Sequence, residues 1–288
     1  MKRVWPPAGR LLAAALPIIV LAFAATGWAQ ERPWTPLPSP TSYSCPDGLC
    51  QAQALAPLFR ALDGRWGGTV RIVQFGDSHT AGRLITGALE TRLKARFPDR
   101  DIRLDPIGIQ NVTLSDLGWR TPPPEMAPVD LVILAYGTNE GFDDDFDAVA
   151  YDHLLRSEIA RMRRLAPRAA ILILSAPEAM RGDGVGSCTD DPERRWRAPV
   201  NLGVVRDVQR RVAAETNVAF WDWWGRMGGE CSAYRLAVPG YLGPDPFMRP
   251  DHVHFTPAGA DWIGGLLYDD LMTAGRAWYA AGSPEGGR

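Results

Sequence analysis

Histidine and cysteine are scarce in this sequence, with four of each among 288 residues. The histidines are His79, His153, His252 and His254, so an imidazole that serves as a general base has few candidates. The cysteines form no CxxC pair and no cluster with histidine, which disfavours a zinc site. Basic residues do not cluster either, and the formal net charge of −2 at pH 7 argues against a nucleic acid as partner.

A long apolar run stands at the N-terminus. Lys2, Arg3 and Arg10 precede an apolar stretch over 11–25, and small residues occupy positions −3 and −1 of a cut after Ala29. This layout is typical of a secretory signal peptide, so we predict that residues 1–29 direct export to the periplasm or the medium and are then removed. A retained membrane anchor is the alternative, because the stretch ending at Ala29 is almost long enough to span a bilayer. Cleavage would leave no stable membrane insertion and a net charge of −5.

The cysteines are Cys45, Cys50, Cys188 and Cys231, an even set in a chain expected to be exported, which indicates disulfides. Four cysteines allow three pairings, and the sequence does not choose among them. A bridge between Cys45 and Cys50 is geometrically easy because a Pro/Gly turn separates them. That bridge would leave Cys188 to pair with Cys231.

Short apolar runs of β character alternate with helical stretches in the rest of the chain. Runs such as 131–135 and 171–174 are continuously apolar, as expected of strands covered on both faces. The alternation predicts an α/β fold, a three-layer α/β/α sandwich around a parallel sheet of about five strands. The expected strands are 70–75, 102–107, 130–136, 170–175 and 217–221, and the expected helices are 52–62, 80–97, 147–166, 200–215 and 257–274. We expect an extended Pro-rich lead-in over 30–51, which includes the local disulfide, and a single domain over 52–280.

Ser78 follows the first expected strand, at the edge where parallel sheets collect their chemistry. A serine at a helix start is most often a cap. Here Gly76 permits a tight turn, and the backbone N–H groups of the first helical turn point where an oxyanion would form. Ser78 is therefore a candidate for a nucleophile and for part of an oxyanion hole.

Asp251 and His254 lie three residues apart on a loop that ends at Thr256-Pro257, an N-cap followed by a proline at the first helical position. On a tight turn, this spacing lets the carboxylate accept a hydrogen bond from imidazole Nδ1–H and leaves Nε2 free to take a serine proton. His252 has the wrong offset for the same face. A surface ion pair, or a metal half-site in the pattern Asp-His-x-His, is the alternative, but no further His or Cys cluster completes a metal site.

Asn139 ends another buried strand, in Tyr136-Gly137-Thr138-Asn139-Glu140. One interpretation is an ordinary Asn/Gly turn. The other is a side-chain amide that donates to an oxyanion. These residues together indicate nucleophilic acyl transfer by a serine esterase.

The ordered set of GDS at 76–78, GTN at 137–139 and DxxH at 251–254 resembles the SGNH (GDSL-type) hydrolases over about 66–274. The resemblance implies a flavodoxin-like fold and a reaction without cofactor or metal. It also implies roles for the residues: Ser78 as nucleophile, His254 as base, Asp251 as the partner that orients it, and Ser78 and Asn139 as oxyanion-hole donors.

The family's remaining oxyanion donor is a backbone N–H from a glycine in a segment like GxxGxT. Here that segment is 108–113, and the expected glycine is Asn111. Asparagine tolerates left-handed backbone angles better than other non-glycine residues, so its N–H could still serve. Gly108 is the less suitable substitute.

Within the family, GDSHTAG, GTNE and HFTPAG look most like periplasmic peptidoglycan O-acetylesterases, which remove acetyl from the 6-hydroxyl of muramic acid. Only 60 residues separate Ser78 from Asn139, too few for the β-module that some of them insert there. The resemblance implies an O-acetylated carbohydrate polymer as partner and an acetyl-serine intermediate. The alternatives are a polysaccharide O-acetyltransferase, a lipase or thioesterase, disfavoured because no lid segment is visible, and a carbohydrate-binding module, disfavoured by the intact Ser/Asp/His set.

The aromatic tract that starts at Phe220-Trp221 finishes the last expected strand, and its tryptophans have two interpretations. Buried core is the default for residues of a strand. Stacking on sugar rings is the alternative for tryptophans near a loop. No other residue is assigned to substrate binding.

Overall fold

The computed structural model of the chain describes residues 45, 48–64, 68–118, 128–182, 188 and 196–282. The predicted signal peptide over 1–29 and most of the predicted lead-in lie outside these residues. All described residues belong to the compact unit Leu37–Arg288. In this part of the chain, no helix combines the length and apolar character needed to cross a membrane.

A six-stranded sheet forms the centre of the fold, in the order β1-β6-β5-β4-β2-β3. Neighbours from β3 through β6 run parallel, as predicted. The sixth strand, β1, is a correction to the expected five: it has two residues and pairs antiparallel with β6. The bounds are Leu49–Cys50 (β1), Thr69–Gly76 (β2), Asp101–Gly108 (β3), Leu131–Ala135 (β4), Ala170–Leu174 (β5) and Ala219–Trp221 (β6).

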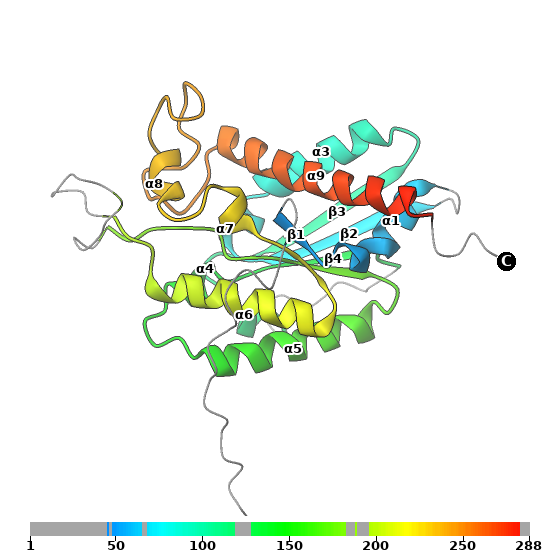
Figure 1. Cartoon of the computed structure of the whole chain (residues 1–288), viewed down its shortest axis with the longest axis horizontal. Helices are drawn as coiled ribbons and strands as arrows, with labels where there is room; N and C mark the ends of the chain where they lie inside the picture. Colours follow the sequence, from blue (N-terminus) through cyan, green and yellow to red (C-terminus); the bar gives the residue numbers. More distant parts are fainter. Residues whose placement is uncertain are drawn as a thin grey trace, which may run out of the picture. The chain divides into compact units, whose positions relative to one another are not determined.

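Helices cover both faces of this sheet (Figure 1). The long helices are Ala56–Asp63 (α1), Leu84–Arg96 (α3), Ala148–Leu165 (α5), Val200–Thr216 (α6) and Pro257–Ala280 (α9). Four short helices lie on connections: Ser78–Ala81 (α2), Thr138–Gly141 (α4), Trp223–Arg226 (α7) and Ser232–Leu236 (α8). Two 3₁₀ turns, Ala52–Leu55 and Leu114–Asp116, complete the described elements. The helix expected over 80–97 is interrupted, because Arg83 adopts a left-handed backbone with φ 57° and caps α3.

The strands alternate their side chains between two apolar layers. In β4, Leu131, Ile133 and Ala135 join the core under α1, α3 and α9. Val132 and Leu134 face the other way and join the core under α5 and α6. A strand that buries both faces must be apolar throughout, which is why this segment shows no polar alternation.

The strand register sets the position of the functional loops. Gly76 at the end of β2 pairs with Gly108 at the end of β3 and with Ala135 at the end of β4. The loops that follow these three parallel strands therefore leave the sheet at one level. The turn before α9 reaches the same edge, where Thr256 accepts a hydrogen bond from Gly259 N at 3.2 Å and Pro257 opens the helix. This helix start is the one predicted.

The structure contains the geometrically easy bridge and the pair that it leaves, one of the three pairings that the sequence left open. Cys45 is bonded to Cys50 beside β1, and Cys188 is bonded to Cys231 at the start of α8. The first closes a short turn at the edge of the sheet. The second links loops that lie 43 residues apart in the sequence.

Candidate active site

Ser78 is the first residue of α2, directly after the sharp turn that ends β2. The N-cap of this helix is Asp77 and not Ser78, since the Asp77 carboxylate accepts the hydrogen bond from His79 N at 3.0 Å. Gly76 makes the turn possible, because a Cβ there would lie 2.6 Å from the Ala135 carbonyl oxygen. The serine hydroxyl is thus free of a capping role and lies at the sheet edge.

A chain of hydrogen bonds joins Ser78 to the loop before α9. His254 Nε2 lies 3.0 Å from Ser78 Oγ, and His254 Nδ1 lies 2.9 Å from Asp251 Oδ2. The other oxygen of Asp251 accepts the backbone N–H groups of Val253 and His254, each at 2.9 Å. The structure therefore brings together the three residues proposed from the sequence, in the order hydroxyl, imidazole, carboxylate.

The carboxyl group of Asp251 is held in its ionised form. Partial burial alone would raise its pKa. The backbone N–H groups of His254 and Val253 and the His254 ring together lower the pKa by more than burial raises it, so the net pKa lies below the ordinary value. An ionised Asp251 accepts a hydrogen bond from His254 Nδ1–H and so favours the tautomer whose Nε2 faces Ser78.

His252 points away from this chain of hydrogen bonds. Its backbone is left-handed, with φ 52°, and its ring packs between Trp196 and Tyr234 with centroid distances of 4.0 and 5.5 Å. Its Nδ1 lies 3.3 Å from the Ala233 carbonyl oxygen. Burial lowers the pKa of this histidine, which fits a neutral ring within an aromatic stack.

The candidate oxyanion donors lie on two linked loops. Asn139, in α4, donates from Nδ2 to the Val112 carbonyl oxygen at 2.6 Å, and its amide carries a second N–H. Asn111 has φ 56°, the left-handed angle that a glycine would adopt without strain. Gly108 has a different role: a Cβ there would lie 2.6 Å from the backbone carbonyl carbon of Thr80, so this glycine permits β3 to approach α2.

Glu140 reinforces the same link and was not singled out from the sequence. Its Oε1 accepts the Leu114 backbone N–H at 2.7 Å, which ties α4 to the segment after Asn111. Burial raises the pKa of Glu140 to about 7. Glu178 is a second buried carboxyl with a pKa raised to about 7 by burial, and it accepts N–H groups of Cys231 and Ala233 at the start of α8. The glutamate of GTNE was visible as part of a motif; Glu178 had no sequence signal.

The cleft beside the hydroxyl is small, with about 290 Å³ of empty volume. Its lining comes from α2, the start of α3, the loop over 249–255 that carries Asp251 and His254, and α9. The lining residues are Ser78, His79, Gly82, Leu84, Ile85, Arg249, His254, Phe255 and Ala260. Apart from Arg249 and the two histidines, this surface is mostly apolar.

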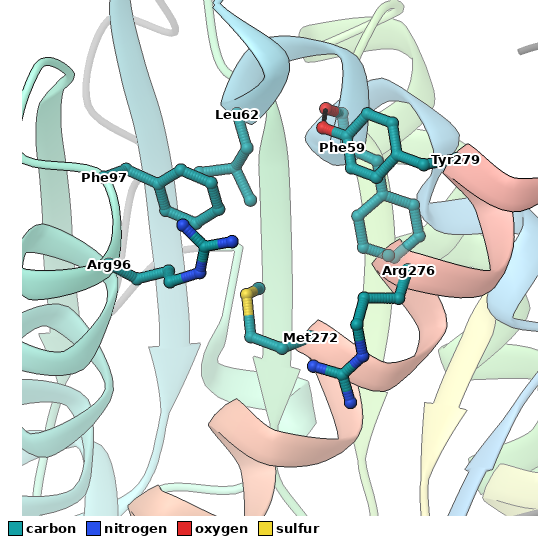
Figure 2. Close-up of a pocket in the computed structure, with 8 residues that line it drawn as sticks. Phe59, Leu62, Arg96, Phe97, Met272, Arg276 and Tyr279 are labelled. Carbon is teal, nitrogen blue, oxygen red and sulfur yellow. Dashed lines mark hydrogen bonds between the residues drawn. The ribbon is translucent and has the colours of Figure 1, made fainter.

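A second cavity lies between α1, the end of α3 and the last turns of α9, with aromatic and aliphatic walls and Arg96 and Arg276 beside them (Figure 2). Met272 follows Pro257 by 15 residues in α9, about 22 Å at the rise of an α-helix. This cavity is therefore distant from Ser78 and takes no part in the candidate site.

Two tryptophans of the aromatic tract belong to the core. Trp221 and Trp223 are 1% and 3% exposed, and the Trp221 ring N–H donates to Asp270 at 2.7 Å. The core interpretation is correct for Trp221. Trp223, which lies beyond the strand and for which the sequence left sugar stacking open, is buried as well. Among the described residues, no group of three His, Cys, Asp or Glu side chains is placed to hold a metal ion.

A Ser–His–Asp hydrogen-bond chain at the carboxyl edge of the sheet is the arrangement found in serine hydrolases, a class that occurs on several unrelated folds. The sequence matches the model of the GDSL-like Lipase/Acylhydrolase family over residues 75–262, so the chain belongs to this family. It is an ester-hydrolysing enzyme.

Solved structures with the same fold include several esterases. A peptidoglycan O-acetylesterase superposes with a TM-score of 0.61 at 20% identity, covering 78% of this chain and 96% of its own. A lipase/acylhydrolase from Enterococcus faecalis gives 0.52 at 20% identity, with coverage of 72% and 97%. An acetyl xylan esterase variant from Geobacillus stearothermophilus gives 0.50 at 21% identity, with coverage of 72% and 95%. A search of curated proteins finds no match to the sequence.

Proposed function

We propose that the protein is an exported esterase that removes O-acetyl groups from a carbohydrate polymer, with 6-O-acetylated muramic acid of peptidoglycan as the foremost substrate. The observation that carries this proposal is the hydrogen-bond chain from Ser78 through His254 to Asp251, open to a small cleft. Export is supported by the predicted signal peptide and by two disulfides, which persist in oxidising compartments.

The proposed reaction begins with Ser78. His254 Nε2 takes the hydroxyl proton as Ser78 Oγ attacks the acetyl carbonyl carbon, and Asp251 stabilises the imidazolium that forms. The sugar oxygen leaves with the proton from His254, and acetyl remains on Ser78. Water then attacks the carbonyl carbon of the acetyl-serine and gives a proton to His254. As the bond from the acyl carbon to Ser78 Oγ breaks, His254 returns that proton to Oγ, which releases acetate and regenerates the free serine and the neutral imidazole.

The oxyanion of both steps would be held by three donors. These are the backbone N–H of Ser78, the backbone N–H of Asn111 and the second N–H of the Asn139 amide. The first two are fixed by backbone geometry, and the Asn139 side chain is oriented by its bond to the Val112 carbonyl. Donors that are already oriented stabilise developing charge without reorganisation during the reaction.

The shape of the cleft favours a short acyl group. Leu84, Ile85 and Phe255 form its apolar wall, and Ala260 of α9 also lines it. A chain of eight carbons would need further apolar surface, at about 0.8 kcal/mol per buried methylene, before it bound better than acetyl. We therefore expect kcat/KM to fall steeply from acetyl to octanoyl p-nitrophenyl esters.

Arg249 supports an anionic polymer over a neutral one. Its backbone is fixed within the loop over 249–255 that carries Asp251 and His254, which we call the catalytic loop: Arg249 N donates to the His254 carbonyl at 2.7 Å, and Arg249 O accepts from His252 N at 2.9 Å. Its side chain lines the cleft with Ser78 and His254. Muramic acid carries a lactyl carboxyl, ionised where no peptide is attached, whereas xylan has a neutral backbone. A guanidinium here would attract such a carboxylate.

Acetate release tests this proposal. Release of the acyl group from O-acetylated peptidoglycan, acetylated xylan and an octanoyl ester is compared at matched ester concentration. The Ser78→Ala protein is the control, and a sample without protein is the blank. We expect the highest kcat/KM on peptidoglycan and no release above the blank from the Ser78→Ala protein. Faster release from xylan would contradict the proposal that peptidoglycan is the substrate, and faster hydrolysis of the octanoyl ester would favour a lipase. Transfer of acetyl to added oligosaccharide without release of acetate would indicate a transferase.

A further inference from the structure

The histidine next to the nucleophile contacts an oxygen atom with each of its two ring nitrogens. His79 follows Ser78 in α2 and is 7% exposed. Its Nδ1 lies 3.2 Å from Asp77 Oδ1, and its Nε2 lies 2.9 Å from the carbonyl oxygen of Val253. Val253 is part of the loop that carries Asp251 and His254, 174 residues away in the sequence. A single ring therefore connects the nucleophile turn with the loop of the general base.

These partners determine how many protons the ring carries. A carbonyl oxygen only accepts hydrogen bonds, and an ionised carboxylate does the same. Asp77 Oδ1 also accepts the His79 backbone N–H at 3.0 Å, so this oxygen already serves as an acceptor. A neutral imidazole has only one N–H, so one of the two contacts would place a lone pair against a lone pair. Both contacts are satisfied only when the ring is an imidazolium.

The charges around the ring support that form. Asp77, 1% exposed, provides the counterion on the same turn, and Asp251 adds a second negative charge from the catalytic loop. Burial lowers the pKa of His79, but Asp77, the Val253 carbonyl and Asp251 raise it, and the net pKa lies above its ordinary value. Two further titratable side chains among the described residues lie nearby: the His254 ring is at a centroid distance of 5.4 Å, and Arg249 lines the same cleft as His79. The other rings against His79 are the neutral side chains of Trp223 and Phe255.

We propose that His79 is a positioning residue for the ester hydrolysis proposed above: as a buried imidazolium, it holds the loop of Asp251 and His254 against the turn of Ser78. The bond to the Val253 carbonyl lies between the two residues of the loop that must face the serine. It therefore keeps His254 Nε2 within 3.0 Å of Ser78 Oγ.

Two conservative substitutions separate the two contacts. In His79→Gln, the amide nitrogen occupies a position close to Nε2 and can still donate to the Val253 carbonyl. In His79→Asn, the shorter side chain can reach Asp77 only. Both variants are uncharged, and His79→Ala lacks both bonds. His153→Gln on the exposed side of α5 is the matched control for loss of a histidine.

We expect kcat on p-nitrophenyl acetate to fall about tenfold or more in His79→Asn and His79→Ala, with less change in KM, while His79→Gln retains most of the rate. Equal rates for Gln and Asn, or a loss that appears in KM rather than in kcat, would overturn the positioning role. The His153→Gln control should match the parent protein.

The wild-type protein provides a readout independent of activity. With ¹⁵N-labelled histidine, only four side chains contribute signals. We expect one ring with both nitrogens protonated at pH 7.5, and that pair of signals should disappear in His79→Gln. Four neutral rings at pH 7.5 would refute the imidazolium even if every variant failed to fold. If the protein showed no esterase activity but retained this ring, the proposed function would fail and the cationic bridge would stand.

Discussion

Replacing Glu140 by glutamine should flatten part of the pH dependence of stability. The Glu140 side chain is 6% exposed, and its Oε1 accepts the Leu114 N–H. A glutamine carbonyl oxygen can accept the same bond. The difference between the two side chains is therefore mainly that glutamine cannot ionise. In Glu178, by contrast, both oxygens accept N–H groups, so the same substitution there would place an amide N–H against a donor.

The sign and size of the effect follow from the raised pKa. Burial raises the pKa of Glu140 from 4.5 to about 7, so the folded protein binds this proton more tightly than the unfolded chain does. Its contribution to stability is complete below pH 4.5 and is lost as pH rises to about 7. At about 1.4 kcal/mol per tenfold change in proton affinity, the loss between pH 5 and pH 8 is about 2.5 kcal/mol.

Urea unfolding at pH 5 and pH 8 measures this effect. The free energy of unfolding of Glu140→Gln, relative to the parent, should rise by about 2.5 kcal/mol from the lower to the higher pH. A constant penalty from the new amide cancels in this difference, as does the titration of Glu178. Glu230→Gln, at an exposed position, serves as the control and should give no such change. If the free energy of unfolding changed with pH by the same amount in the parent and in Glu140→Gln, the raised pKa of Glu140 would be refuted.

Other substitutions address the proposed chemistry. His254→Ala should lower kcat by orders of magnitude, whereas His252→Ala should mainly lower the melting temperature, because its ring fills an aromatic stack; equal losses of kcat would mean that the base is misassigned. Asn139→Ala should lower kcat by two to three orders of magnitude, as is typical of a lost oxyanion donor, and a loss below threefold would remove it from that role. Asn111→Gly should retain kcat, since glycine keeps the N–H and adopts φ 56° freely; a large loss would show that the asparagine side chain acts in the reaction.

The central sheet was predictable because burial on both faces leaves a strong pattern. The apolar runs at 131–135 and 171–174 correspond to β4 and β5 to within a residue at each end. The strand β1 was missed, since two residues beside a disulfide turn show no periodicity. The short helices α4, α7 and α8 were missed for the same reason, as four or five residues span little more than one turn.

The site was partly visible in the sequence. The offset of three between Asp251 and His254 is a local property, and strand topology brings Ser78 to the same edge. The bridge from His79 to Val253 could not be foreseen, because it joins segments 174 residues apart and depends on side-chain orientation. Buried carboxyls such as Glu178 have the same limitation: their environment is created by distant segments and leaves no trace in spacing.

The most direct test of the account is the site at which a serine-directed phosphonate reacts. Intact protein is treated with the reagent, digested, and analysed by mass spectrometry, with acetylated substrate as competitor and His254→Ala as the comparison. The account predicts one adduct per chain, on Ser78, formed more slowly with substrate present and far more slowly in His254→Ala. An adduct on another serine, or esterase turnover that persists in Ser78→Ala, would contradict it.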